Sequence, residues 1–95
     1  MKNYESMIVI DPALTEEDAV AENSKLLDLI KENEGEIINS DKWGKKKLAF
    51  EIEKKNEGFY FVNYFMLDPQ KIAIIDRYYK LSDKIFRFNM IVKEN

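Results

Sequence analysis

The chain contains no cysteine and no histidine among its 95 residues. Without cysteine it can form neither a disulfide nor a thiolate nucleophile, and the usual zinc sites lose their ligands. Without histidine it lacks the side chain that most often carries acid–base chemistry near neutral pH. These absences exclude most enzyme designs, so we expect no catalytic activity, no metal site and no cofactor.

Glycine and long apolar runs are also scarce. The three glycines are scattered at positions 35, 44 and 58, so no glycine-rich loop is present to cradle a phosphate. The first apolar run, Met7 to Ile10, is too short for the core of a signal peptide or for a membrane span. We therefore expect a cytoplasmic protein without a membrane partner, folded as a single domain over residues 1–95.

Charge is distributed unevenly along the chain, although the net charge is only -3. Residues 1–41 carry 3 lysines against 11 acidic residues, whereas residues 42–95 carry 12 basic residues against 7 acidic ones. The first part therefore has a net charge of -8 and the second part a net charge of +5. This asymmetry allows a basic surface on an acidic protein.

The first half of the chain predicts a strand and a helix. Residues 2–10 end in a β-branched run and indicate a strand, which we expect to be central in its sheet. Thr15 precedes three acidic residues, the pattern of a helix start, and Gly35 is the expected helix stop. The helix should span residues 16–34, with Glu22 among the residues of a solvated outer face.

The second half predicts a hairpin, a helix and a last strand. Residues 36–52 should form a strand bent at Gly44, joined through a turn at residues 54–58 to a strand at residues 59–67. Asp68-Pro69 is a typical helix start, and the apolar spacing after it predicts a helix to about Lys80. Residues 85–93 alternate as a strand, with Arg87 and Lys93 on the face away from the core.

The element order is β-α-β-β-α-β. With right-handed crossovers it predicts an α+β fold, the ferredoxin-like plait, with two helices on one face of a four-stranded antiparallel sheet. Asn63 interrupts the apolar set on one face of its strand, so the choice of the inward face stays open at this point. If the helices cover Phe59 and Phe61, the other face presents Tyr60, Val62, Tyr64 and Met66. Such an apolar patch indicates a protein partner, unless loops or lysine stems cover it.

Three adjacent lysines, Lys45, Lys46 and Lys47, lie on or beside a strand, because apolar residues then alternate at Leu48, Phe50 and Ile52. Two interpretations fit these lysines. They can belong to a solvated edge strand, where lysine prevents pairing with another sheet. Alternatively, they form a phosphate-binding patch in which the bend turns all three side chains in one direction. Glu51 and Glu53 share a face of the same strand. We interpret them as screening the lysines rather than as a catalytic or cation-binding pair.

The fold by itself leaves the function open, because RNA-recognition domains, small-ligand regulatory domains, metallochaperones and acylphosphatases share it. A metallochaperone needs the cysteines that are absent. The segment Gly58-Phe59-Tyr60-Phe61 is only weakly similar to the aromatic motif with which RNA-recognition domains stack bases. A ligand-regulated dimer that self-associates through the apolar sheet face remains the alternative.

The decamer Trp43 to Ile52 also carries a resemblance. An aromatic residue, a glycine, a basic cluster and Leu-Ala-Phe-Glu-Ile follow in the order and spacing of the bacterial small-subunit ribosomal protein S six family. Tyr4-Glu5, Asp11-Pro12 and Gly58-Phe59-Tyr60 fall in register with that family as well, so the resemblance covers nearly the whole chain. The basic cluster, which often contains arginine in relatives, is all lysine here, so two-pronged contacts at Lys46 or Lys47 are not expected. The sequence stops at Asn95, and we carry over no contacts of the longer C-terminal tail of some relatives.

The resemblance implies a structural component of the small ribosomal subunit, without catalytic activity or small-molecule substrate. Members of the family bind the central domain of small-subunit rRNA as a heterodimer with the eighteenth small-subunit protein. On this basis we expect partner-binding residues at Tyr60, Val62, Tyr64 and Met66. The residues that we expect close to the rRNA are Lys2, Tyr4, Arg87 and Lys93, with Lys45, Lys46 and Lys47 as a second patch.

Overall fold

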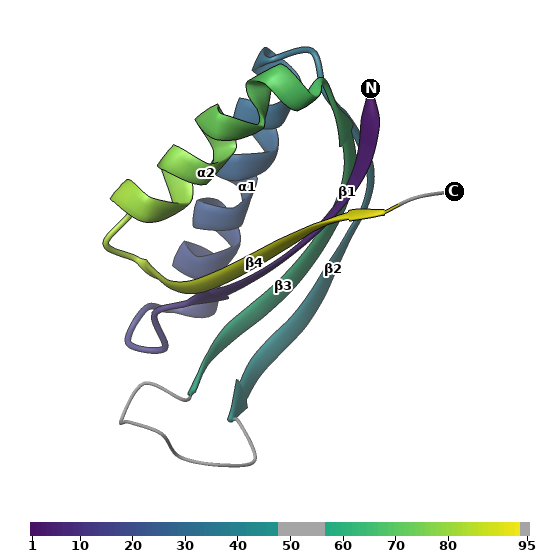
Figure 1. Ribbon diagram of the computed structural model, residues 1–95. Coiled ribbons are helices and arrows are strands. Elements are labelled where there is room, and N and C mark those ends of the chain that lie inside the picture. Colours follow the sequence, from purple (N-terminus) through teal and green to yellow (C-terminus); the bar gives the residue numbers. More distant parts are fainter. Residues whose placement is uncertain (48–56, 94–95) are drawn as a thin grey trace.

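Two helices and four strands form two layers. In the computed structural model, residues 1–47 and 57–93 are described. The elements are β1 (Lys2–Ile10), α1 (Glu16–Glu32), β2 (Glu36–Lys47), β3 (Glu57–Leu67), α2 (Ile72–Leu81) and β4 (Ile85–Lys93), with a short 3-10 turn at Pro69–Lys71. The strand order is β2-β3-β1-β4 with antiparallel neighbours throughout. Both helices lie on one face of this sheet (Figure 1), which confirms the predicted ferredoxin-like plait.

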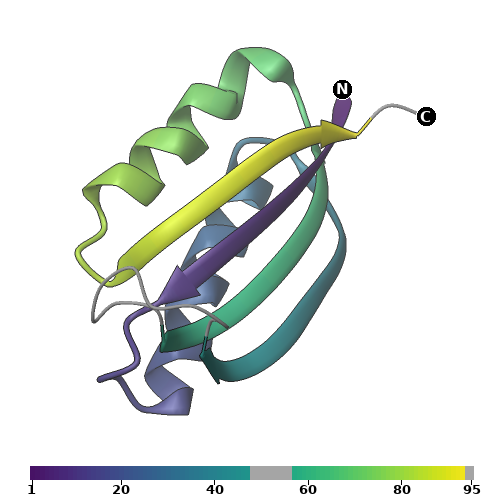
Figure 2. The same ribbon diagram turned by 60° about the horizontal axis from the view of Figure 1, so that its bottom comes forward.

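β1 is central, as predicted, because it pairs with β3 on one side and β4 on the other (Figure 2). Its even-numbered residues from Tyr4 to Ile10 are buried toward the helices, and their register partners on β3 are buried as well. Apolar side chains of α1 and α2 pack against these strand residues and complete the core. The inward residues of β3 are Phe59, Phe61, Asn63, Phe65 and Leu67.

Asn63 belongs to the inward face, which settles the question that the sequence left open. Its amide Nδ2 donates to Asn23 Oδ1 of α1 at 2.8 Å, and its Oδ1 accepts from Ser40 Oγ of β2 at 2.6 Å. A buried amide is tolerated only when its polar atoms find partners, and here a second amide supplies them. A further buried polar pair joins Ser6 and the Tyr79 hydroxyl, so both helices are tied to the sheet through polar as well as apolar contacts.

The ends of α1 follow local chemistry. The Thr15 hydroxyl accepts from the Asp18 N–H at 3.1 Å, which confirms the predicted cap. At the other end the left-handed residue is Glu34 (φ 66°), not Gly35, which corrects the prediction that Gly35 supplies the stop. The Gly35 N–H bonds to Ile30 O at 2.9 Å in a Schellman-type end. Gly35 is required by space, because a Cβ there would lie 2.9 Å from the Met66 carbonyl oxygen.

Glu22 is buried, which corrects its assignment to the solvated face of α1. Its carboxylate accepts from the Tyr78 hydroxyl at 2.9 Å and from Ser82 Oγ at 3.2 Å. Two lysine ammonium groups lie nearby, those of Lys25 at 3.7 Å and Lys84 at 3.9 Å. Glu22 therefore connects α1 to the C-terminal end of α2, and burial together with the hydrogen bond to Glu22 raises the pKa of Tyr78.

β2 is bent at the predicted place. Its register against β3 shifts between Ile37 and Asn39 and again between Lys42 and Gly44, and Gly44 adopts φ 82°. Such irregularities increase the local twist and make an edge strand a poor template for pairing with another chain. The predicted continuation of this strand through Leu48, Phe50 and Ile52, the pair Glu51 and Glu53, and residues 54–56 of the turn lie outside the described residues.

Gly44→Ala isolates the cost of the backbone conformation. A Cβ at this position would meet no atom within 4 Å, so no steric clash is added. The left-handed φ remains unfavourable for alanine, and we expect a loss of about 1–2 kcal/mol in the free energy of unfolding. Urea denaturation measures it, with Gly44→Asn as the control that should lose less, because asparagine tolerates this region better. Equal losses in both variants would contradict a purely backbone origin.

Candidate nucleic-acid and partner interface

We call the sheet face opposite the helices the open face. The strand register shows which residues belong to it. Odd-numbered residues of β1 lie on it, and their partners on β3 and β4 lie beside them. As predicted, it carries Arg87 and Lys93 from β4. The side chains predicted to bind a partner, Tyr60, Val62, Tyr64 and Met66, all belong to this face.

The two halves of that predicted partner-binding set differ in exposure. Tyr60 and Val62 are only 6% and 4% exposed, whereas Tyr64 and Met66 are half-buried. Tyr60 and Val62 can therefore support an interface but offer little surface to it. The sequence prediction placed these residues on the right face and did not anticipate their burial.

Trp43 and Ile91 supply the apolar surface that the prediction missed. Trp43 is 49% exposed and Ile91 is 43% exposed. Both line one hollow of the open face, whose other walls come from Glu5, Met7, Val62, Tyr64 and Asn89. The available signals were the single tryptophan beside Gly44 and the alternation of Ile91 with the inward residues of β4.

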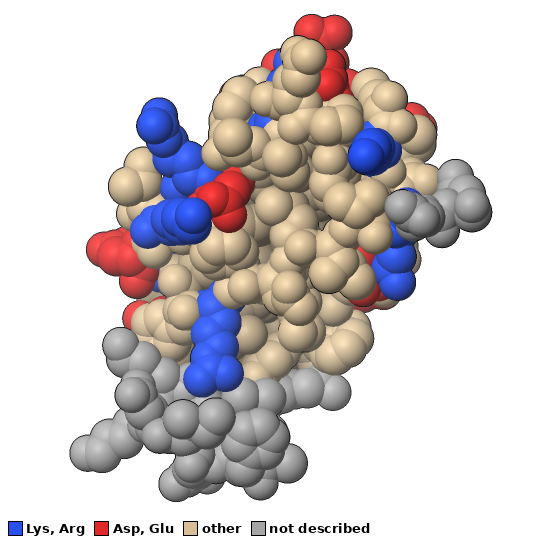
Figure 3. All heavy atoms as spheres, viewed as in Figure 1, with Lys and Arg blue, Asp and Glu red and all other residues tan. Residues whose placement is uncertain are grey.

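The predicted rRNA-binding residues fall into two groups rather than one. Lys93 pairs in register with Asn3, and exposed Lys2 lies next to it, at what we call the terminal end of the sheet. Arg87 pairs with Val9, at the opposite end. Six residues of strand separate these positions, a distance of about 20 Å. Figure 3 shows the side of the molecule seen in Figure 1, where basic groups are spread around uncharged surface.

Tyr4 does not fit its predicted role. It lies on the helix-covered face, is 5% exposed and stacks on Phe65 with the ring centroids 5.6 Å apart. Burial and the nearby charge of Asp68 raise the pKa of its hydroxyl. Neither side of the ring is open for stacking on a base, so Tyr4 presents little surface for the rRNA contact predicted for it. Sequence alternation assigns Tyr4 and Lys2 to the same face, but only Lys2, at the strand start, remains exposed.

The three adjacent lysines are consecutive paired residues of β2. Lys45, Lys46 and Lys47 pair with Phe59, Gly58 and Glu57, at what we call the hairpin end of the sheet. The described side chains include that of Lys45 but not those of Lys46 and Lys47, so the common direction of the three charges stays a prediction. The ammonium group of Lys45 lies 3.6 Å from Glu57 Oε1 and 5.8 Å from the centre of the Phe59 ring.

Acidic groups stand among the cations of the open face. Glu5 Oε1 lies 3.7 Å from Lys93 Nζ. Asp41 Oδ1 accepts from Asn39 Nδ2 at 3.0 Å. Partial burial raises the pKa of Tyr64, and the charges of Glu5 and Asp41 together with a hydrogen bond to Glu5 raise it further. The open face thus combines apolar side chains with both signs of charge.

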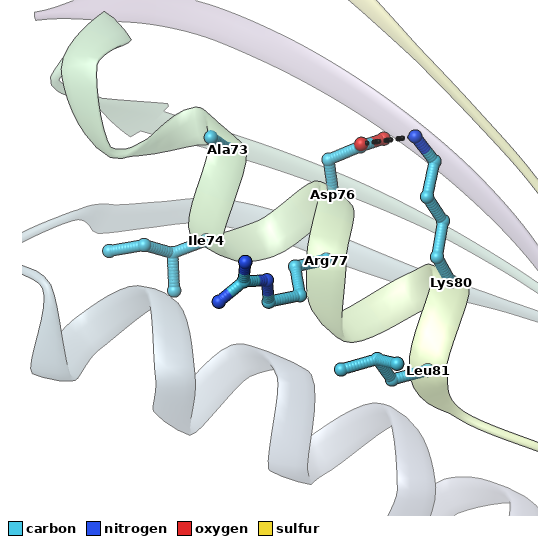
Figure 4. A pocket seen from close by; sticks show the side chains of 6 residues that line it. All are labelled: Ala73, Ile74, Asp76, Arg77, Lys80 and Leu81. Carbon is cyan, nitrogen blue, oxygen red and sulfur yellow. Dashed lines mark ion pairs between the residues drawn. The ribbon is translucent and has the colours of Figure 1, made fainter.

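Another hollow lies elsewhere, along α2. Ile74, Arg77 and Leu81 follow one another along the helix, and Asp76 is paired with Lys80 at 2.8 Å (Figure 4). Every residue that lines this hollow comes from the same helix, so no group from a second element faces them. It lacks the convergent polar groups of a small-molecule site.

Residues 1–47 and 57–93 contain neither a metal-binding cluster nor a membrane-spanning helix. No group of three or more acidic side chains there is arranged to hold a metal ion. No helix in the same part of the chain is long and apolar enough to span a membrane.

Solved structures resemble this one to different degrees. The crystal structure of 30S ribosomal protein S6 from Thermotoga maritima superposes with a TM-score of 0.90 at 32% identity, covering 97% of this chain and 87% of that one. The C-terminal domain of the MgtC protein from Mycobacterium tuberculosis superposes with a TM-score of 0.68 at 8% identity, covering 99% of this chain and 89% of that one. The second likeness shows the fold alone.

Sequence relatives are similar over almost their whole length. The small ribosomal subunit protein bS6 of Thermoanaerobacter pseudethanolicus is 41% identical over 91 residues, which cover 96% of each chain. That of Desulforamulus reducens is 40% identical over 94 residues, covering 99% of this chain and 98% of the other. The family model for ribosomal protein S6 matches residues 3–93. This chain therefore belongs to the ribosomal protein S6 family, as its resemblance in sequence predicted.

Proposed function

We propose that this chain is a structural, non-catalytic component of the small ribosomal subunit. In this role it binds central-domain small-subunit rRNA as a heterodimer with the eighteenth small-subunit protein. The observation that carries the proposal is the match to the ribosomal protein S6 family over residues 3–93. A ribosome-associated place in the cytoplasm follows from the same role.

The open face is the proposed protein interface. Exposed Trp43 and Ile91 line one hollow together with buried Val62 and half-buried Tyr64, so a partner can bury large side chains there without reorganising the sheet. Aromatic residues of this kind dominate the binding energy of protein interfaces. Because the chain has a net charge of -3, a basic partner would also supply much of the attraction toward RNA.

The proposed rRNA contacts are Lys2, Arg87 and Lys93, with Lys45, Lys46 and Lys47 as a second patch. Tyr4 is left out because its ring is buried. Contacts at the terminal and hairpin ends would touch the RNA at separated points, with the protein interface between them. This arrangement suits an acidic chain that adds a few phosphate contacts to a complex.

A gel-shift experiment tests the proposal. A central-domain rRNA fragment is titrated with this chain, with the eighteenth small-subunit protein, and with both, at two salt concentrations. Binding that requires both proteins supports the heterodimer. Tight binding by this chain alone would overturn the need for a partner, and no binding in any mixture would favour the ligand-regulated dimer.

Arg87→Ala and Lys93→Ala should weaken binding of the heterodimer to rRNA without destabilising the fold, because both side chains are exposed. Each lost phosphate contact should lower the slope of log K against log salt concentration by about one. Lys80→Ala on α2 is the matched control, since it removes one positive charge from the helix layer. A slope reduced equally by all three substitutions would show that net charge, rather than position, sets the effect.

A further inference from the structure

Glu5 occupies the middle of the open face. Its register partners are Tyr64 on β3 and Ile91 on β4, and Lys93 is the diagonal neighbour whose ammonium group lies 3.7 Å from its carboxylate. The Glu5 side chain is 27% exposed, against 51% for that of Lys93. Glu5 also lines the same hollow as Trp43 and Ile91. A carboxylate thus stands inside the apolar surface that a partner would cover.

Covering this carboxylate has a cost that constrains the partner. An ionised carboxyl group removed from water loses its hydration, and it is tolerated in an interface only when a cation or several hydrogen-bond donors face it. Within the open face Lys93 supplies the charge that faces the Glu5 carboxylate. A partner that covers Trp43 and Ile91 must either bury the Glu5–Lys93 pair or bring a cation of its own.

The geometry of the pair favours the exchange of Lys93 for another cation. Lys93 is the last residue of β4, at the sheet edge, with about half of its side chain in solvent. An ion pair of this exposure contributes little to stability, so its separation costs little. Glu5 belongs to an inner strand and is the more buried member of the pair, with its side chain 27% exposed. The lysine is therefore the member of the pair that can leave.

We propose that Glu5 is a positioning residue that couples partner binding to RNA binding. In the free chain it holds Lys93 over the open face. When the partner covers that face, one of the partner's cationic side chains takes the place of Lys93 at Glu5. Lys93 then turns outward to an rRNA phosphate. The inference rests on the proposed function and adds to it the order of events: the protein interface forms first, and the phosphate contact follows.

The test combines Glu5→Gln with Lys93→Ala and measures rRNA binding with and without the partner, and heterodimer formation without RNA. Glu5→Gln removes the charge while keeping the size of the side chain. We expect it to weaken heterodimer formation about tenfold, as loss of one member of a covered charge pair does. We also expect it to tighten rRNA binding by the chain alone about threefold, because Lys93 is released.

The salt dependence of rRNA binding distinguishes a role of Glu5 in coupling the two binding events from a merely structural role. In the otherwise unchanged chain, Lys93→Ala should lower the salt slope only when the partner is present. In combination with Glu5→Gln, it should lower the slope without the partner as well. Asp41→Asn is the matched control, because it removes a carboxylate from the same face that is bonded to Asn39 rather than to a lysine. Glu5→Asp, which keeps the charge, should retain heterodimer formation.

Two outcomes are distinguishable. If the unmodified pair of proteins binds rRNA but Lys93→Ala has the same effect with and without the partner, the coupling through Glu5 is overturned and the proposed function stands. If the unmodified pair does not bind rRNA, the proposed function itself is overturned, and the coupling with it. Equal urea midpoints for all variants show that folding is not the cause.

Discussion

Phe65→Ala should destabilise the protein by about 3–5 kcal/mol, the range for truncation of a buried phenylalanine. Phe65 is fully buried near the C-terminal end of β3, on the face that the helices cover, and its ring stacks on Tyr4. Truncation removes the apolar area of the ring and leaves a cavity that close-packed neighbours fill only in part. Urea denaturation followed by circular dichroism measures the loss as a shift of the midpoint.

A small domain has a total stability of only about 5–15 kcal/mol, so Phe65→Ala can unfold the chain outright. Phe65→Leu keeps most of the volume and should cost about 1 kcal/mol, which gives a folded variant for comparison. If both variants lost the same amount, stacking on Tyr4 rather than the cavity would be the larger contribution. A loss below about 1 kcal/mol for alanine would contradict the central position of this ring.

Asn63→Ala should destabilise the protein by about 3 kcal/mol through a different mechanism. Asn63 is fully buried, and its amide is bonded to Asn23 and to Ser40. Its removal leaves the Asn23 carbonyl oxygen without the donor that faces it, and an unpaired buried polar group costs about 1–3 kcal/mol in addition to the cavity. Ser40→Ala, which leaves the two amides paired, should cost only about 1 kcal/mol.

A double-mutant cycle distinguishes the polar mechanism from simple loss of volume. Asn23→Ala and Asn63→Ala each leave one buried amide without its partner, whereas the double variant removes both amides. The double variant should therefore lose clearly less stability than the two single variants added together. Additive losses would show that the amides contribute through packing alone.

The same pair shows where sequence reasoning reached its limit. The alternation of β3 predicted two faces, but an asparagine within one apolar set left the inward face open. The inward face of β3 is explained by α1, because Asn23 on this helix lies within hydrogen-bonding distance of Asn63 in the core. No local pattern shows that two amides 40 residues apart satisfy one another.

Glu22 and Tyr4 are the clearest disagreements, and both have the same cause. Helical spacing assigned Glu22 to solvent, but Tyr78 and Ser82, which arrive from the far end of the chain, enclose it. Tyr4 is buried because it belongs to the hydrophobic core between the sheet and the helices, where its ring stacks on Phe65. Burial of a polar or aromatic side chain depends on which distant segments of the chain pack against it, and this is a property of the tertiary structure.

The sequence alone determined the element order, which residues of a strand share a face, and the place of the bend in β2. These follow from local causes: period-two alternation, a threonine cap and a glycine that tolerates a left-handed φ. The resemblance of the sequence to the ribosomal protein S6 family predicted that the chain belongs to this family, and the match of the family model confirms it. Only the tertiary structure decided which surface is available, because exposure is the sum of contacts between distant segments. It buried Tyr60, Val62 and Tyr4, exposed Trp43 and Ile91, and placed Glu5 beside Lys93.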